Sequence, residues 1–291
     1  MRGGLQMTEG EVVAQTTKTS TATVTGASGG ARHLFTACDV TAVMPRRGGG
    51  ETTVFQGLEF HVGGGEVVDL TGPSGSGKST LLTAFARLNV YTTGSFALDG
   101  KDSDTFTPQQ WRVNVAYLPQ TSTLIGETVA DAIRLPWTLK VRQGERAHEP
   151  KDMLSDAHIR ATLDRMGCRD IDLGRAPRDL SGGQAARVSL ARTLLTKPRV
   201  LLADEVDAGL DEENADKVAD LLKLAAHEGT AVVRIRHRAP DGRATRMMVL
   251  KDGALREVPL PTAAQVAAAR RADVVDGSAD DTADGTADEK E

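Results

Sequence analysis

The sequence lacks several features that mark whole classes of protein. No run of 18 or more apolar residues occurs among its 291 residues, so we expect no membrane-spanning helix. The first residues lack the apolar core of a secretory signal, so we expect the chain to work in the cytoplasm. Its two cysteines, Cys38 and Cys168, match no metal-binding or redox spacing, which favours buried free thiols in a reducing compartment.

Strong charge of either sign is missing from the central part of the chain. The net charge is −5, yet residues 273–291 hold eight acidic side chains against one lysine, which leaves the remainder close to neutral. We predict one folded unit at 34–262, a disordered segment at 1–33, and an alanine-rich, then acidic, disordered tail at 263–291. Because the folded part has no strong basic stripe, we expect no nucleic-acid partner.

Hydrophobic patterning predicts strands that alternate with helices. Residues 113–118, 199–203 and 230–235 read as strands, and the second of these is apolar without a break from Val200 to Ala203, as buried parallel strands are. A helix is predicted between Ser155, its N-cap, and Gly167, where the pattern stops. This alternation favours an α/β fold with a mainly parallel sheet.

The most informative segment is a glycine-rich loop between an apolar strand and a helix-compatible run. It matches the phosphate-binding pattern G-x-x-x-x-G-K-[ST]. Backbone N–H groups and the helix N-terminus of such a loop attract phosphate oxygens, Lys78 reaches the β- and γ-phosphates, and Ser79 binds Mg²⁺. The loop consists of Gly72, Pro73, Ser74, Gly75, Ser76, Gly77, Lys78, Ser79 and Thr80.

Two acidic residues follow the apolar strand at 199–203. Asp204 and Glu205 stand where the carboxyl end of a parallel strand faces a ligand crevice. Asp204 is a candidate Mg²⁺ ligand, and Glu205 is a candidate to polarise an attacking water. An acidic strand end is common without any such site, so this interpretation depends on the phosphate loop.

A second glycine-rich turn precedes another helix-compatible run. It offers a hydroxyl, N–H groups and a helix dipole to phosphate, although an ordinary serine-capped helix looks the same. The segment consists of Leu180, Ser181, Gly182, Gly183 and Gln184. With this segment, residues 36–258 resemble the nucleotide-binding cassette of ABC transporters. The stretch at 127–137 loosely resembles the short cassettes of iron or metal export.

The resemblance assigns further residues by their place in the family's order of motifs. Gln120 matches the glutamine of the Q-loop, at the metal, and His237 matches the switch histidine, which contacts the γ-phosphate. Asp211 matches the D-loop aspartate with its cross-dimer role, although alone it is a helix cap. Met44 stands where the family usually stacks an aromatic residue on adenine, which puts base selectivity in doubt.

The resemblance also implies an architecture, ligands and partners. It implies a P-loop NTPase cassette with a mainly parallel core sheet, an N-terminal antiparallel β subdomain and a helical subdomain at about 121–180. ATP and Mg²⁺ are the implied ligands, and the catalytic roles fall to Lys78, Gln120, Glu205 and His237. Two cassettes of a homodimer sandwich ATP between this loop and the partner's glycine-rich turn. They drive a separate transmembrane permease, which holds them at the inner face of the membrane.

A soluble mechanochemical ATPase of DNA repair, chromosome maintenance or translation is the alternative. Such relatives carry a long inserted coiled coil, zinc-binding cysteines or two cassettes in one chain, and this sequence has none of these. Transport is therefore favoured. The apolar segments 121–125 and 135–137 are candidates for contact with the permease, although Trp137 is equally consistent with a core position.

Overall fold

The computed structural model describes residues 33–46, 48–121, 123–142 and 154–277. The predictions for residues 1–32 and 278–291 lie outside this description. Within it, no helix is both long and apolar enough to cross a lipid bilayer. The strands are β1 (His33–Pro45), β2 (Glu51–Gly63), β3 (Val67–Thr71), β4 (Thr92–Leu98), β5 (Lys101–Asp102), β6 (Val115–Leu118), β7 (Val200–Asp204), β8 (Ala231–Ile235), β9 (Arg246–Lys251) and β10 (Ala254–Val258). The α-helices are α1 (Lys78–Phe85), α2 (Pro108–Asn114), α3 (Val129–Arg134), α4 (Asp156–Arg165), α5 (Gly182–Leu195), α6 (Glu212–His227) and α7 (Ala263–Gly277).

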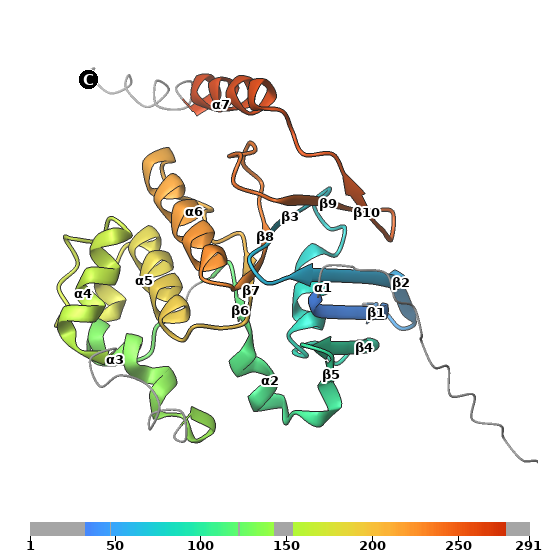
Figure 1. The fold of residues 1–291 in the computed structure, drawn as a ribbon, viewed down its shortest axis with the longest axis horizontal. Helices are drawn as coiled ribbons and strands as arrows, with labels where there is room; N and C mark the ends of the chain where they lie inside the picture. Colours follow the sequence, from blue (N-terminus) through green and yellow to red (C-terminus); the bar gives the residue numbers. More distant parts are fainter. Residues whose placement is uncertain (1–32, 47, 122, 143–153, 278–291) are drawn as a thin grey trace, which may run out of the picture. The chain divides into compact units, whose positions relative to one another are not determined.

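Two sheets form the framework of this part of the chain. The larger has the strand order β10-β9-β3-β8-β7-β6, and only the β9–β10 pair in it is antiparallel. The smaller sheet, β2-β1-β4-β5, is antiparallel throughout. Figure 1 shows α3, α4 and α5 gathered together, away from the strands of the smaller sheet. The predicted α/β fold with a mainly parallel core sheet is confirmed.

Alternation along the central strands explains how the core is divided. Successive side chains of a strand point to opposite faces. Val200 and Leu202 of β7 join the apolar cluster that includes α1 and the smaller sheet, whereas Leu201 and Ala203 join the cluster formed with α3 to α6. The larger sheet is therefore covered on both faces, which is why β7 reads as a continuous apolar run.

Capping residues set the start of two helices as predicted. Ser155 Oγ accepts a hydrogen bond from His158 N at 3.2 Å at the start of α4, and Gly167 follows that helix with a φ of 71°. Asp211 Oδ1 accepts from Asn214 N at 2.8 Å at the start of α6. Each cap satisfies a backbone N–H that the helix leaves unpaired.

Three sequence-based predictions are wrong. Residues 113–114 end α2 instead of starting a strand, because Thr107 forms a capping box and the following proline starts the helix. Residues 263–277 form α7 instead of a disordered tail, since an alanine-rich segment favours helix. Cys38 is exposed, because it follows the buried Phe35 and Ala37 in the alternation of β1 and so points to the outer face of the strand.

Candidate functional site

The phosphate loop joins the end of β3 to the start of α1, in the strand–loop–helix arrangement expected from its flanks. Gly72 and Gly77 have φ angles of 144° and 97°, which side-chain-bearing residues rarely adopt. A Cβ at Gly72 would collide with the carbonyl of Leu250, and one at Gly77 with the side chain of Val54. Glycine at both positions therefore permits a tight loop with inward-facing backbone.

Lys78 is buried against the loop that precedes it. Its Nζ donates to the carbonyl oxygens of Gly72 at 2.9 Å and of Pro73 at 3.0 Å. Among the described residues, the buried Oγ of Ser76 has no hydrogen-bond partner. A buried cation held by neutral carbonyls, beside an unpaired hydroxyl, suits an anionic ligand. The rest of the loop, which is exposed or half-buried, comprises Ser74, Gly75, Ser79 and Thr80.

Asp204 ends β7 next to this loop. Ser79 Oγ donates to its Oδ1 at 3.1 Å, and the hydroxyl of Tyr117 donates to its Oδ2 at 2.8 Å. Burial, reinforced by the hydrogen bond and charge of Asp204, raises the pKa of Tyr117, so the phenol stays a donor. A buried carboxylate beside a hydroxyl supplies the hard oxygen ligands that Mg²⁺ prefers, so these residues fit that ion.

Glu205 follows in a left-handed backbone conformation with a φ of 52°, which is uncommon outside glycine and concentrated at functional sites. Its Oε1 lies 2.7 Å from His237 Nε2, and its Oε2 accepts from Gln120 Nε2 at 2.8 Å. Gln120 follows β6, Glu205 follows β7 and His237 follows β8, which are neighbours in the sheet. The carboxyl ends of these parallel strands thus bring three distant residues together.

The second glycine-rich turn lies at the start of α5, and its residues hydrogen-bond mainly to one another. Ser181 Oγ accepts from Gln184 N at 3.2 Å, and Gln184 Oε1 accepts from Ser181 N at 3.0 Å, which is a capping box. Gln184 Nε2 also donates to Asp170 at 2.6 Å. Within the described residues, these bonds join the turn to its own neighbours and not to the phosphate loop. A Cβ added to Gly182 would meet nothing within 4 Å.

Two other candidates also lie outside the cluster around Glu205. Met44 is half-buried near the end of β1, opposite Thr52 of β2. Asp211 is exposed at the start of α6, where hydrogen bonds from Asn214 lower its pKa and keep it ionised. The adenine contact of Met44 and the cross-dimer role of Asp211 stay predictions.

Sequence reasoning missed Tyr117 and the ion pair between Arg236 and Asp207, whose atoms Nε and Oδ2 lie 2.9 Å apart. Tyr117 looked like one more apolar strand residue. Arg236 precedes His237, and Asp207 follows Glu205 by two positions, so both were visible beside candidate residues. Their pairing depends on which strands are neighbours, and no local pattern reports that.

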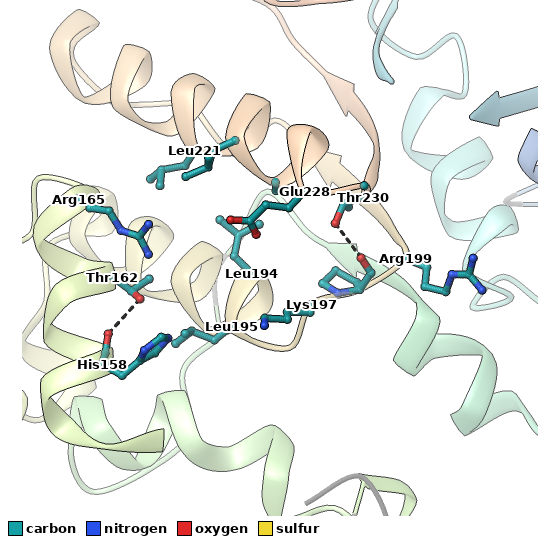
Figure 2. Close-up of a pocket in the computed structure, with 14 residues that line it drawn as sticks. His158, Thr162, Arg165, Leu194, Leu195, Lys197, Arg199, Leu221, Glu228 and Thr230 are labelled. Atoms are coloured by element: carbon teal, nitrogen blue, oxygen red, sulfur yellow. Dashed lines mark hydrogen bonds between the residues drawn. The ribbon is translucent and has the colours of Figure 1, made fainter. Parts of the chain in front are cut away.

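A separate hollow of about 500 Å³ lies among α4, the end of α5 and α6 (Figure 2). Leu194, Leu195 and Leu221 give it an apolar lining, to which Arg165 and Lys197 add positive charge. None of the predicted nucleotide-site residues lines this hollow. It is therefore distinct from the cluster around Glu205.

Known proteins share this arrangement of motifs. A family model described as ABC transporter matches residues 55–208. The probable iron export ATP-binding protein FetA of Escherichia coli (strain K12) is 35% identical over 189 residues, which cover 65% of this chain and 80% of FetA. The hemin import ATP-binding protein HmuV of Nocardia farcinica is 36% identical, over 67% of this chain and 66% of HmuV. Some relatives are much longer: the chain spans 24% of human ATP-binding cassette sub-family B member 6, at 34% identity.

Solved structures support the same conclusion. The dimeric structure of MJ0796, a bacterial ABC transporter cassette, matches with a TM-score of 0.65 and 26% identity, covering 79% of this chain and all of that one. A post-hydrolysis state of MJ0796 bound to ADP and Pi matches with a TM-score of 0.63 over the same shares. The chain therefore belongs to the ABC transporter family, as an ATP-binding cassette that hydrolyses ATP.

Proposed function

We propose that this chain is the ATP-binding subunit of a transporter, which dimerises head to tail on ATP and drives a separate membrane permease. The observation that carries the proposal is the carboxylate of Glu205, which both Gln120 and His237 contact. The preceding residue, Asp204, is hydrogen-bonded to Ser79 of the phosphate loop. Relatives named for iron export and hemin import support a role in transport. The permease would hold the cassette at the cytoplasmic face of the membrane.

Glu205 is the residue that we assign to the attacking water. One hydrogen bond from Gln120 and the contact with His237 fix the two carboxylate oxygens, so the base is oriented before substrate arrives. The water attacks the γ-phosphorus as the bond to the bridging oxygen of ADP breaks. Lys78 exchanges its two carbonyl partners for phosphate oxygens and stabilises their charge.

Ser79 and Asp204 are the residues that we assign to Mg²⁺. When bound, this ion neutralises charge on the β- and γ-phosphates. Tyr117 holds the second oxygen of Asp204 and leaves the first directed at Ser79. Gln120 donates its amide N–H to Glu205, which leaves its carbonyl oxygen as a further ligand for the ion.

The turn at Ser181–Gly183 supplies the facing half of the site in this proposal. Ser181 and Gly182 are exposed at the start of α5, where backbone N–H groups and the helix dipole favour an anion. The capping box holds the turn in shape without a ligand. A second copy would therefore present this turn, already formed, to the γ-phosphate bound by the first.

Mixing two inactive variants tests the head-to-tail arrangement. Lys78→Ala disables the phosphate loop of one copy, and Ser181→Arg disables the turn of the other. In a mixed dimer, one site combines the intact loop of the second copy with the intact turn of the first. ATPase activity should therefore reappear on mixing at equal concentrations, with each variant alone as the control. No recovery, together with mixed dimers seen by crosslinking, would contradict this arrangement.

Exposed apolar residues in the segment between β6 and α4 are the surface that we assign to the permease. Ile125 is 62% exposed and Leu139 is 51% exposed. A neighbouring groove of about 310 Å³ is lined in part by Pro136, Leu139 and Val141. Trp137 is 1% exposed and packs in the core, so its core interpretation holds and it is not part of this surface.

Co-purification with the permease tests this surface and the transport role together. Ile125→Asp and Leu139→Asp should release the cassette from its permease and leave its own ATPase activity intact. Leu260→Asp is the matched control, because Leu260 is an apolar residue that is 43% exposed and does not line this groove. An ATPase rate stimulated by nucleic acid, with no permease recovered, would favour a soluble mechanochemical ATPase instead.

The transported substrate is the property that we assign to the permease and not to this chain. The relatives' names include iron export, hemin import and macrolide export, at similar identity to this chain. A cassette sequence of this kind thus accompanies different cargoes and opposite directions of transport. Assays of the complete transporter with candidate substrates, read as stimulated ATPase rate, would identify the cargo.

A further inference from the structure

Next to the catalytic cluster lies a buried chain of alternating charges. Arg234 Nε lies 2.6 Å from Asp69 Oδ1, and Arg234 Nη2 lies 2.8 Å from Asp241 Oδ1. The other oxygen of Asp241 lies 2.6 Å from Arg236 Nη1, and Arg236 Nε lies 2.9 Å from Asp207 Oδ2. We call these five residues the ion chain. It runs from β3 through β8 to the loop that follows β7.

The ion chain is almost completely withdrawn from water. Its five side chains are between 2% and 9% exposed. Burying charges costs free energy that pairing repays only when geometry is good, and apolar residues often stabilise such a position equally well. Burial raises the pKa of Asp69, which Arg234 partly offsets. Burial acts in the same direction on Asp241, but its arginine partners outweigh it and lower that pKa. Stability alone therefore does not account for the ion chain.

The positions of Arg236 and Asp207, at one end of the ion chain, suggest a role in the catalytic step. Arg236 immediately precedes His237, and Asp207 follows Glu205 by two residues. Their ion pair thus joins the two backbone segments that carry the contact between His237 and Glu205, which measures 2.7 Å. A backbone hydrogen bond from Glu205 N to Ile235 O, at 3.2 Å, joins the same two segments just before the ion-paired residues. Arg238 donates a hydrogen bond to Leu210 O and joins the two segments again just after the ion-paired residues.

We propose that Arg236 and Asp207 are positioning residues, which hold His237 against Glu205 for the hydrolysis step. The inference rests on the roles assigned to Glu205 and His237 in the proposed function. Neither side chain belongs to the phosphate loop, where Lys78 and Ser79 have partners of their own. Loss of the ion pair should therefore slow hydrolysis and leave ATP affinity unchanged. An ion pair with a purely structural role would not separate these two quantities.

The test compares Arg236→Gln, Arg236→Lys and Asp207→Asn in the wild-type chain and in a His237→Ala background. In the wild-type chain, Arg236→Gln and Asp207→Asn should lower kcat about ten- to hundredfold, the cost of a misplaced reacting group, with the ATP dissociation constant unchanged. Arg236→Lys should recover part of the rate, since it keeps the charge but loses the planar fork. In the His237→Ala background, none of the three should lower kcat further.

Arg246→Gln is the matched control. Arg246 also bridges two carboxylates, Glu66 at 3.3 Å and Glu257 at 2.9 Å, but it lies on β9, away from His237. This variant should lower the melting temperature without changing kcat. Arg236→Gln removes the cation that two buried carboxylates, Asp207 and Asp241, share, so it is the variant most at risk of not folding. In that event, Asp207→Asn and Arg236→Lys, which nearly preserve side-chain size, carry the same test.

Two results would overturn the inference. In the first, the variants lower kcat by the same factor in both backgrounds, so that Arg236 and Asp207 act independently of His237. In the second, ATP affinity falls in step with kcat. Failure of the proposed function would look different, because His237→Ala by itself would then leave kcat unchanged.

Discussion

The two glycine-rich segments of this chain have opposite surroundings. The phosphate loop has Asp204 beside it, and Gln120, Glu205 and His237 gather at the next position along the same sheet edge. The turn at Ser181–Gly183 is bonded to itself and its own neighbours and presents Gly182 to open space. The first segment thus lies within the cluster that we propose to be catalytic, whereas the second keeps its own shape and faces outward.

In the proposed dimer, this contrast assigns the two segments of one chain to different halves of a shared site. Chemistry that needs close geometry, such as the contact between Glu205 and His237, is assembled within one fold. The outward turn needs only a rigid helix start, which its capping box provides locally. Variants of the two segments should therefore affect different steps.

Glu205→Gln should have the largest effect and tests the embedded segment. Loss of the proposed base should lower kcat about a thousandfold. ATP affinity should be retained, and an ATP-bound dimer should accumulate. Phosphate release and size-exclusion chromatography with ATP measure the two outcomes, and Glu228→Gln, at an exposed position, is the control. Phosphate release at the wild-type rate would contradict the assignment.

Lys78→Ala should act on the same segment at the binding step. Removal of a charge-assisted bond to the phosphates should weaken ATP binding by about ten- to hundredfold. Titration calorimetry or a fluorescent ATP analogue measures the dissociation constant. Lys197→Ala, at an exposed lysine away from the loop, should leave it unchanged. The same dissociation constant in both variants would remove Lys78 from the nucleotide site.

Gly182→Ala separates the outward segment from the embedded one. The methyl group meets nothing within the chain, and alanine favours helix, so the melting temperature and the ATP affinity of the monomer should not fall. Against a facing phosphate it would overpack the interface and weaken ATP-dependent dimerisation about tenfold.

Gly174→Ala is the matched control for that substitution, since Gly174 lies in the same part of the fold with room for a methyl group and no unusual φ. Analytical ultracentrifugation with ATP compares the two variants. Equal dimerisation in both would show that the turn at Ser181–Gly183 does not face a second copy.

Tyr117→Phe should have the smallest effect. It removes only the hydroxyl that donates to Asp204 at 2.8 Å, so the Mg²⁺ concentration needed for half-maximal activity should rise severalfold. Metal titration of the ATPase rate measures this shift. An unchanged titration would mean that Ser79 alone is enough to orient the carboxylate.

The local features of this protein could be predicted from the sequence. The loop at 72–80, the caps Ser155 and Asp211, and the continuous apolar strand β7 depend on residues a few positions apart, whose spacing reports helix, strand or turn directly. Composition was a weaker guide: it suggested disorder for 263–277, where the alanine content favours the helix α7 instead.

The sequence by itself determined which groups we propose for the chemistry, because the phosphate loop and the pair Asp204–Glu205 are local patterns. Only the tertiary structure decided which distant residues meet. Gln120 and His237 reach the same carboxylate, and Arg236 reaches Asp207, because β6, β7 and β8 are neighbours in one parallel sheet. The pairing of strands separated by tens of residues depends on the packing of the whole core, which spacing along the chain does not encode.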